Sequence, residues 1–417
     1  MRRQLALGTA LALAFGAHAA VAADCKIGVV MELTGPAGAY GQAGAKSIEM
    51  AFHDLNTSGG PMPCTLVPDT RDSQSQGTVA VDAAKQLVDI DHVPAIIGGI
   101  ISSVSIPILT SVTAPAKVVQ VSPASSSPTL TALGRDGKTN GIFFRTITSD
   151  ALQGVAAAKY AMDLGFKKLA IIQVNNDFGV NMAREFSKSY VALGGTITST
   201  TPYNEKQASY DAEVTSAMQG EPQALYLVSY PVDGATIARS WISKGGPRKF
   251  LLNDGMNSGD FITAVGAKYL NDAYGTSSGT EDTPSTTYFN EHYKAFSGLD
   301  PGSPAAVQAY DAAALVGLAV AQAGRADSEG IRDGIYKVTD PAGTPVYAGP
   351  EGFKKGLELI KEGKPIRYLG VIGPISFDKY GDITGPFREW QIEDGKVVTK
   401  GEMTTADVDK IRAQIMK

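Results

Sequence analysis

Two pairs of small hydroxyl residues follow neighbouring apolar runs in the first third of the chain. Ser102 and Ser103 come soon after the run 95–97, and Ser125 and Ser126 follow the next run. In open α/β sheets, ligands bind beyond the carboxyl ends of the strands, where helices begin and free backbone N–H groups attract anions. A serine at a helix start can cap the helix and can also donate its hydroxyl to a ligand oxygen. Each pair alone fits ordinary capping better, whereas the two pairs together suit one carboxylate as well as they suit capping.

Aromatic residues and one acid occupy comparable positions elsewhere in the chain. Phe178, Tyr230 and Asp254 each come shortly after a strand-like run between residues 169 and 252, and Tyr40 lies in the first glycine-rich turn. At one edge of a second sheet, these groups would complement the serines across a cleft. The pair formed by Asp254 and the glycine after it is equally typical of a plain turn.

Groups that could carry out catalysis are sparse. After residue 23 the chain has three histidines, His53, His92 and His292, and none lies at metal-ligand spacing. No H-E-x-x-H motif occurs, and the first turn has glycines at 35, 38, 41 and 44 rather than G-x-G-x-x-G. We therefore expect no enzymatic activity, no metal and no cofactor, with an exported α/β enzyme acting on a small acid as a remote alternative.

The N-terminal residues are typical of an export signal. Two arginines precede the apolar segment 5–15, and small residues run up to Ala23. This pattern predicts a cleavable signal peptide at residues 1–23 and a free periplasmic protein. Cys25 lies near the cleavage point, but Asp24 before it argues against a lipoprotein, because lipidation requires a small residue there.

The two cysteines predict a disulfide. Cys25 and Cys64 are the only cysteines, and each begins an apolar run. Exported proteins form disulfides readily, and adjacent parallel strands would place the two thiols side by side. The alternative is two free buried thiols.

Length and charge bound the class of protein. A chain of 417 residues with 43% hydrophobic and 19% charged residues fits two globular domains. The net charge is −5 and the chain has no basic cluster, so we expect no nucleic-acid partner and no binding to an anionic membrane surface.

Short apolar runs alternate with helical patterns in two successive blocks. The strand-like runs are 27–31, 66–67, 95–97, 118–121 and 141–145, then 169–174, 196–200, 224–228 and 250–252. A helix is expected near 106–112, and after residue 284 mostly helices are expected, with late strands at 368–372, 375–377 and 389–392. Strands separated by amphipathic helices predict parallel sheets with right-handed crossovers, and two blocks predict two α/β lobes.

Several stretches resemble the type I periplasmic solute-binding proteins of ABC transporters, in the leucine/isoleucine/valine-binding branch. The similarity covers about residues 25–395. The matching stretches are IGVVMELTGPAGAYGQAGAKSIEMAFHDLNTSGG, PAIIGGIISSVS, VSPASSSPTLT, VNNDFGVNMAREF and FLLNDGMNSGDF. The resemblance implies two Rossmann-like lobes, parallel sheets flanked by helices, joined by a three-crossing hinge. The implied boundaries are 24–146 plus 280–372 for the N-terminal lobe and 147–279 plus 373–417 for the C-terminal lobe.

The same resemblance implies roles for particular residues. Ser102 and Ser126 would bind a ligand α-carboxylate, and the Ala124 carbonyl and the Asp254 carboxylate would bind an α-ammonium. Three aromatic residues would line the cleft: Tyr40, Phe178 and Tyr230. Three positions depart from the family pattern, which often has threonine at 126, tyrosine at 178 and glutamate at 254.

The implied function is capture of a small amino acid, of branched-chain or aliphatic type, for delivery to an ABC permease in the inner membrane. A monomer is expected. The departures at Phe178 and Asp254 leave open the same fold and transport role for an amide, urea or an aromatic carboxylate.

Overall fold

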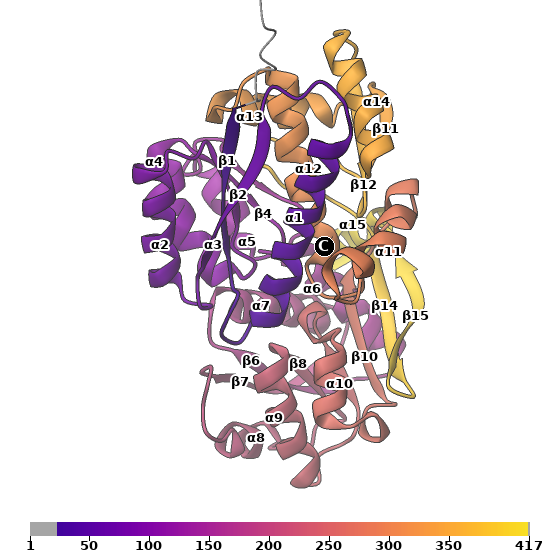
Figure 1. Ribbon diagram of the computed structural model, residues 1–417. Coiled ribbons are helices and arrows are strands. Elements are labelled where there is room, and N and C mark those ends of the chain that lie inside the picture. The colour runs from indigo at the N-terminus through magenta and orange to yellow at the C-terminus, as the bar shows by residue number, and fades with distance from the viewer. Residues whose placement is uncertain (1–22, 416–417) are drawn as a thin grey trace, which may run out of the picture.

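The computed structural model describes residues 23–415, and its core is built on two large sheets (Figure 1). The predicted signal peptide lies outside the described residues, apart from Ala23. The first sheet is all parallel, with the spatial order β2 (Thr65–Asp72), β1 (Asp24–Met31), β3 (Ala95–Gly98), β4 (Val119–Ser122) and β5 (Phe143–Arg145). Its helices are α1 (Gly38–Thr57), α2 (Gly77–Lys85), α3 (Ser102–Ile108), α4 (Ala114–Ala116) and α5 (Pro128–Arg135).

The second sheet is parallel apart from two strands at one edge. Its order is β15 (Lys396–Met403), β14 (Phe387–Glu393), β10 (Ala273–Ser278), β9 (Phe250–Leu252), β8 (Ala224–Val228), β6 (Lys168–Val174) and β7 (Thr196–Tyr203). Strands β14 and β15 are antiparallel to their neighbours. The helices of this lobe are α6 (Asp150–Asp163), α7 (Asp177–Ala192), α8 (Asp211–Ala217), α9 (Pro231–Ser243), α10 (Gly259–Val265) and α15 (Thr405–Ile415).

The chain passes between the two lobes three times. It leaves the first lobe after β5, returns to it after β10 without adding a strand to the first sheet, and goes back to the second sheet after residue 374. The returning part contains α11 (Pro284–Ser297), α12 (Ala306–Ala323), α13 (Ser328–Val338), α14 (Pro350–Lys361) and a small sheet of β11 (Thr344–Tyr347), β12 (Ile366–Gly370) and β13 (Gly373–Pro374). In Figure 1 this part lies beside α1, which packs against α12. The fold is the two-lobed α/β architecture that the sequence predicts.

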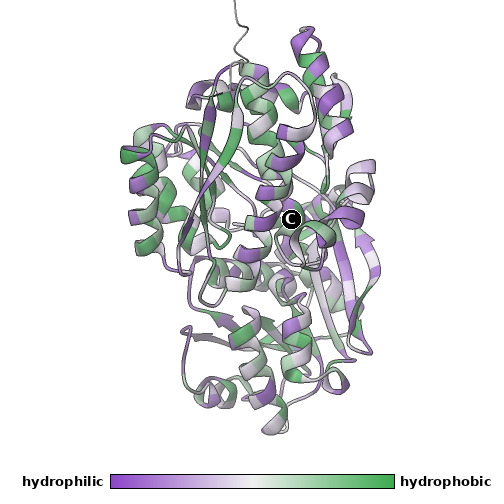
Figure 2. Ribbon diagram, viewed as in Figure 1, coloured by the Kyte–Doolittle hydropathy of each residue, from purple (hydrophilic) through white to green (hydrophobic). Residues whose placement is uncertain are grey.

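Burial follows the apolar pattern of the sequence. Strands β3, β4 and β8 are buried along their whole length, as expected for central parallel strands covered on both faces. Apolar and polar residues alternate around outer helices such as α2 (Figure 2). Among the described residues, α12 alone is long and apolar enough to span a membrane, but 72% of it is buried and it packs against α1 and α13. It is therefore a core helix here.

The disulfide prediction is confirmed. Cys25 and Cys64 are bonded, with their Cα atoms 5.7 Å apart. Strands β1 and β2 are parallel neighbours, and Asp24 pairs with Thr65, so the two cysteines lie at the same end of the sheet. The bond ties the first strand to the chain that leaves α1.

Two predicted elements are wrong in place or kind. The helix expected near 106–112 begins at Ser102, so Pro107 lies inside it, and a π-helical turn, Leu109–Thr113, follows. Proline lacks the N–H that would donate to the carbonyl four residues earlier, which disturbs a regular helix at this point. Residues 375–377, expected as a strand, have no strand pairing, although Ile375 is buried. A buried segment outside a sheet has the same run of apolar residues as a buried strand, so the sequence pattern does not distinguish them.

Candidate functional site

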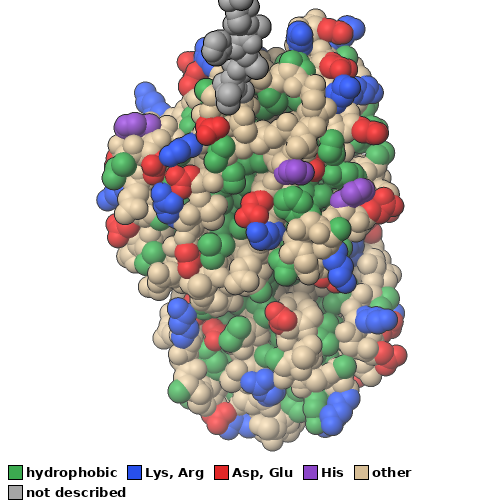
Figure 3. Space-filling model, in the orientation of Figure 1, with side chains coloured by type: hydrophobic (Ala, Val, Ile, Leu, Met, Phe, Trp, Pro, Cys, Tyr) green, Lys and Arg blue, Asp and Glu red, His purple; other side chains and the backbone are tan. Residues whose placement is uncertain are grey.

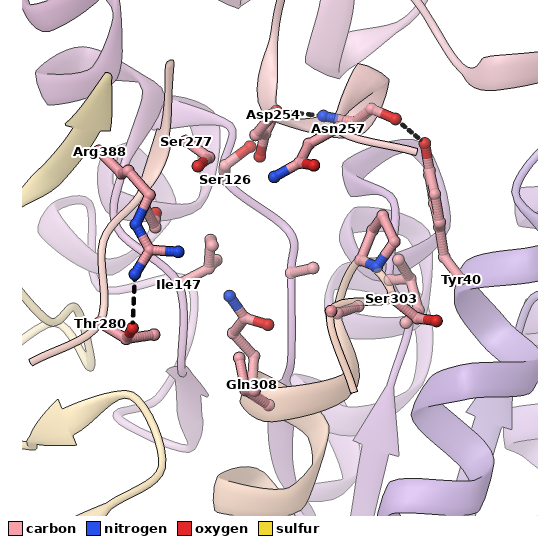
Figure 4. Close-up of a pocket in the computed structure, with 18 of the residues that line it drawn as sticks. Tyr40, Ser126, Ile147, Asp254, Asn257, Ser277, Thr280, Ser303, Gln308 and Arg388 are labelled. Carbon is pink, nitrogen blue, oxygen red and sulfur yellow. Dashed lines mark hydrogen bonds between the residues drawn. The ribbon is translucent and has the colours of Figure 1, made fainter. Parts of the chain in front are cut away.

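One cavity of about 270 Å³ lies between residues of both lobes (Figure 4). The carboxyl ends of β3 and β4 lead into one wall, and the carboxyl end of β9 leads into the other. Seven of the nine binding residues predicted from the sequence line it: Tyr40, Ser102, Ala124, Ser126, Phe178, Tyr230 and Asp254. Ser103 and Ser125 do not. The strand-end argument therefore predicts residues that meet at one cavity, beyond the carboxyl ends of strands from both sheets.

Hydrogen bonds between the segments after β3 and β4 hold the cavity wall that contains Ser102 and Ser126. The hydroxyl oxygen of Ser102 accepts a hydrogen bond from the Ser127 N–H at 3.1 Å, which joins the start of α3 to the start of α5. The hydroxyl of Ser125 is fully buried, 3.1 Å from the Ile100 carbonyl and 2.7 Å from the Ser105 hydroxyl. Ser125 thus has a structural position, whereas Ser102 keeps its hydroxyl hydrogen for a group in the cavity.

A buried carboxyl group fixes the loop before α3. Glu32, at the end of β1, accepts hydrogen bonds from the N–H groups of Ile100, at 3.0 Å, and Ile101, at 3.1 Å. Burial raises the pKa of Glu32 to about 7, although the bonds from the two amides lower it. Glu32 therefore sets the path of the segment that carries Ser102 into the cavity.

The opposite wall presents Asp254. It begins a short 3₁₀ turn, Asp254–Met256, and one carboxylate oxygen accepts hydrogen bonds from the Gly255 N–H at 2.9 Å and the Asn253 amide at 3.3 Å. Burial raises the pKa of Asp254, and these hydrogen bonds oppose the rise. Gln153, on α6, also lowers this pKa, and the carboxylate lines the cavity, where it can accept from a donor.

A second acid lies behind Asp254. Asp150, in the first turn of α6, is fully buried, and neither of its carboxyl oxygens has a hydrogen-bond partner among the described residues. Burial raises the pKa of Asp150 well above its ordinary value, and the charge of Asp254 adds to the effect. Like charges close together disfavour ionisation, so a charged Asp254 makes Asp150 harder to ionise.

Aromatic side chains close the sides of the cavity. The rings of Phe178 and Tyr230 stack with their centroids 5.9 Å apart, and the Tyr230 hydroxyl accepts a hydrogen bond from the Asn176 amide at 3.1 Å. The Tyr40 hydroxyl donates to the Gly255 carbonyl of the other lobe (Figure 4). The Asn181 amide, on α7, donates to the Ser127 hydroxyl at 3.2 Å. The last two bonds join the two lobes beside the cavity.

Comparison with known sequences places the chain in a family. A sequence profile described as periplasmic binding protein matches residues 24–356. The chain belongs to the periplasmic binding protein family. Among its relatives, Leu/Ile/Val-binding protein homolog 3 of Brucella melitensis biotype 1 is 26% identical over 404 residues, covering 95% of this chain and 99% of the relative. Leu/Ile/Val-binding protein BraC3 of Rhizobium johnstonii is 27% identical, covering 94% and 97%.

Solved structures agree with this binding-protein fold. A leucine-binding protein from Thermotoga maritima has a TM-score of 0.77 at 24% identity, covering 92% of this chain and 99% of that one. A solute-binding protein from R. palustris in complex with benzoate has a TM-score of 0.74 at 16% identity, covering 91% and 96%. At these identities the likeness shows the fold, which is that of type I periplasmic binding proteins.

Part of the cavity of this periplasmic binding protein was not predicted from the sequence. Polar side chains reach it from segments after residue 256, and several are drawn in Figure 4: Asn257, Ser277, Thr280, Ser303, Gln308 and Arg388. The end of β10 carries the same glycine- and hydroxyl-rich signal, in Ser277, Gly279 and Thr280, whereas no such signal marks Gln308 on α12 or Arg388 on β14. On the face shown in Figure 3, basic and acidic side chains are interspersed over both lobes rather than gathered by sign.

Glu32 gives a testable dependence of stability on pH. Its pKa is raised from 4.5 to about 7, so the folded protein holds a proton that the unfolded chain releases. This stabilisation is complete below pH 4.5 and is lost as the pH rises to about 7, a loss on the order of 3 kcal/mol. In Glu32→Gln this component should be absent. Urea unfolding at several pH values between 4.5 and 8 would measure the difference between parent and variant.

The control for this measurement is Glu358→Gln, at an exposed position on α14. It should leave the pH profile of the parent unchanged. Parallel profiles for the parent and Glu32→Gln would show that Glu32 does not change its protonation on unfolding.

Proposed function

We propose that the protein captures a small α-amino acid between its lobes and delivers it to an ABC permease in the inner membrane. The observation that carries this proposal is a single cavity with both halves of a zwitterion site: Ser102 and Ser126 at helix starts on one wall, and Asp254 on the other. Amides at the start of a helix lack partners within it and attract anions, whereas a carboxylate suits an ammonium group. The names of the curated relatives support an amino acid as ligand and favour an aliphatic side chain.

The proposed cycle is a trap that closes on its ligand. A ligand that touches both walls binds the closed state better than the open state and so shifts the population toward it. Two interlobe bonds, from Tyr40 to Gly255 and from Asn181 to Ser127, support this view because they form only when the lobes meet. The three passages between the sheets, near the boundaries 146, 279 and 372 inferred from the sequence, would be the hinge. Export to the periplasm through the predicted leader belongs to the same proposal.

A second candidate keeps the fold and the transport role but changes the ligand to an amide, urea or an aromatic carboxylate. The observation that favours it is the raised pKa of Asp254, because a protonated carboxyl group can hydrogen-bond a neutral ligand as well as a cation.

Thermal unfolding with a ligand panel tests both candidates. The protein would be denatured and refolded to remove bound ligand, then heated with natural amino acids, small amides, urea and aromatic acids. A ligand at a hundred times its Kd stabilises the folded state by about 2.7 kcal/mol, which raises the Tm by a few degrees. A shift with amino acids supports the first proposal. A shift only with ligands that lack an ammonium group refutes it and supports the second.

A further inference from the structure

Arg388 brings a positive charge to the cavity. It lies on β14, is partly buried, and lines the cavity on the flank opposite Tyr40 (Figure 4). Its backbone pairs with Ser277 of β10, so the two side chains leave the same face of the sheet. Its guanidinium donates one hydrogen bond to the Thr280 hydroxyl at 3.0 Å. No motif in the sequence points to this residue, which lies on a late strand 134 positions after Asp254.

No acid pairs with this guanidinium in the described part of the chain. Neither Asp282, at the rim of the cavity, nor Glu402, opposite Arg388 on β15, has a carboxylate oxygen within 4.0 Å of it. Arg145 is a contrasting case: it is fully buried, bonded to Asp382 at 2.7 Å, and donates to the carbonyls of two residues at 3.1 Å. The interior arginine of the fold thus has its partners within the chain, whereas Arg388 directs unused donors toward the cavity.

Neighbouring groups add hydrogen-bonding capacity at the same end of the cavity. The carboxamide of Gln308, on α12, faces the cavity in Figure 4, and its amide nitrogen can donate to a ligand oxygen. The hydroxyls of Ser277 and Thr280 line the same region. A partly buried cation without a counter-ion is unfavourable, and a carboxylate that accepts two hydrogen bonds from the guanidinium would relieve it.

We propose that Arg388 binds a second anionic group at the far end of the ligand, so that the preferred ligands are α-amino acids with an acidic side chain. This inference rests on the proposed function, since Ser102, Ser126 and Asp254 hold the α-carboxylate and the ammonium. It departs from the aliphatic side chain that the relatives' names favour. An aliphatic ligand would place apolar surface against the guanidinium and leave it without a counter-ion. A terminal carboxylate would supply one.

Isothermal titration of refolded protein with L-glutamate, L-2-aminoadipate and L-leucine would test the inference. We expect the parent to bind at least one of the two acidic amino acids ten or more times more tightly than leucine. Arg388→Met should weaken that binding by about 10- to 100-fold and leave leucine binding within threefold, since a hydrogen bond to a charged group contributes about 1.5–3 kcal/mol. Arg239→Met, at an exposed position on α9, is the matched control and should match the parent.

The outcomes separate this inference from the proposed function. Tight binding of leucine with weak binding of both acidic amino acids, unchanged in Arg388→Met, refutes the role of Arg388 and leaves amino-acid capture standing. Glutarate tests whether Asp254 binds an ammonium group, because glutarate has two carboxylates and no ammonium group. Glutarate binding as tight as glutamate binding, and lost in Arg388→Met, supports the anion site and refutes the ammonium site. Urea unfolding curves of Arg388→Met should match those of the parent. If Arg388→Met unfolds at a lower urea concentration, Arg388→Lys replaces it as the test variant. Arg388→Lys keeps the positive charge and should recover part of the affinity for the acidic amino acids.

Discussion

Replacing Asp254 with asparagine should weaken amino-acid binding at pH 7.5 by about 100-fold. The change keeps the shape of the side chain and its bond from the Gly255 N–H, but it removes the charge that faces the cavity. Removing one partner of a buried charge pair costs about 2–5 kcal/mol, much of it from the ammonium group left unpaired. Titration of the refolded variant with the tightest amino acid of the parent measures the change.

Ligand affinity should depend less on pH in Asp254→Asn than in the parent. Burial raises the pKa of Asp254, and protonation of this carboxylate competes with the ligand ammonium group. Affinity of the parent should therefore fall as the pH is lowered from 7.5 to 5, and ligand binding at acidic pH should release a proton. Asp254→Asn should show a flatter profile. Asp260→Asn, at an exposed position on α10, is the control. Unchanged affinity in Asp254→Asn would mean that the ammonium group, if the ligand has one, binds elsewhere.

The fold could be predicted from the sequence because parallel strands are buried on both faces. Runs such as 95–97 and 224–228 are apolar without alternation, and they fall on β3 and β8. Once the strands are placed, topology alone puts their carboxyl ends at one edge. That is why Ser102, Ser126 and Asp254 were found without knowledge of any side-chain contact.

Finer details of the site depend on contacts that a linear pattern does not encode. The start of α3 at Ser102, four residues before the expected helix, decides that Ser102 faces the cavity while Ser103 does not. No motif marks Glu32 in the sequence. Its carboxyl group accepts hydrogen bonds from two amides of the loop after β3, and this contact exists only once the chain is folded. Arg388 and Gln308 come from the late part of the chain, where the regular alternation of strand and helix ends.

The largest expected loss of stability is for Arg145→Met, at the end of β5. The guanidinium of Arg145 is fully buried and bonds Asp382 at 2.7 Å, the carbonyls of Ser125 and Ser127 at 3.1 Å, and the Thr131 hydroxyl at 2.8 Å. Methionine fills similar space but leaves a nearly buried carboxylate and two carbonyls without donors. Breaking such a pair costs about 3–5 kcal/mol. Urea unfolding should show the loss, and Arg135→Met, at an exposed position on α5, should not.

A double-mutant cycle separates the ion pair from the rest of this network. Asp382→Asn alone leaves the buried guanidinium without its counter-ion, and Arg145→Met alone leaves the carboxylate without one. The double variant removes both charges, so it should be more stable than the sum of the two single losses predicts, by about 1–3 kcal/mol. Additive losses would show that the pair contributes little. Ligand affinity should still fall in the double variant, because the carbonyls of Ser125 and Ser127, on either side of Ser126, lose the donor that holds them. Arg145 therefore links the stability of the loop after β4 to the position of Ser126, which lines the cavity.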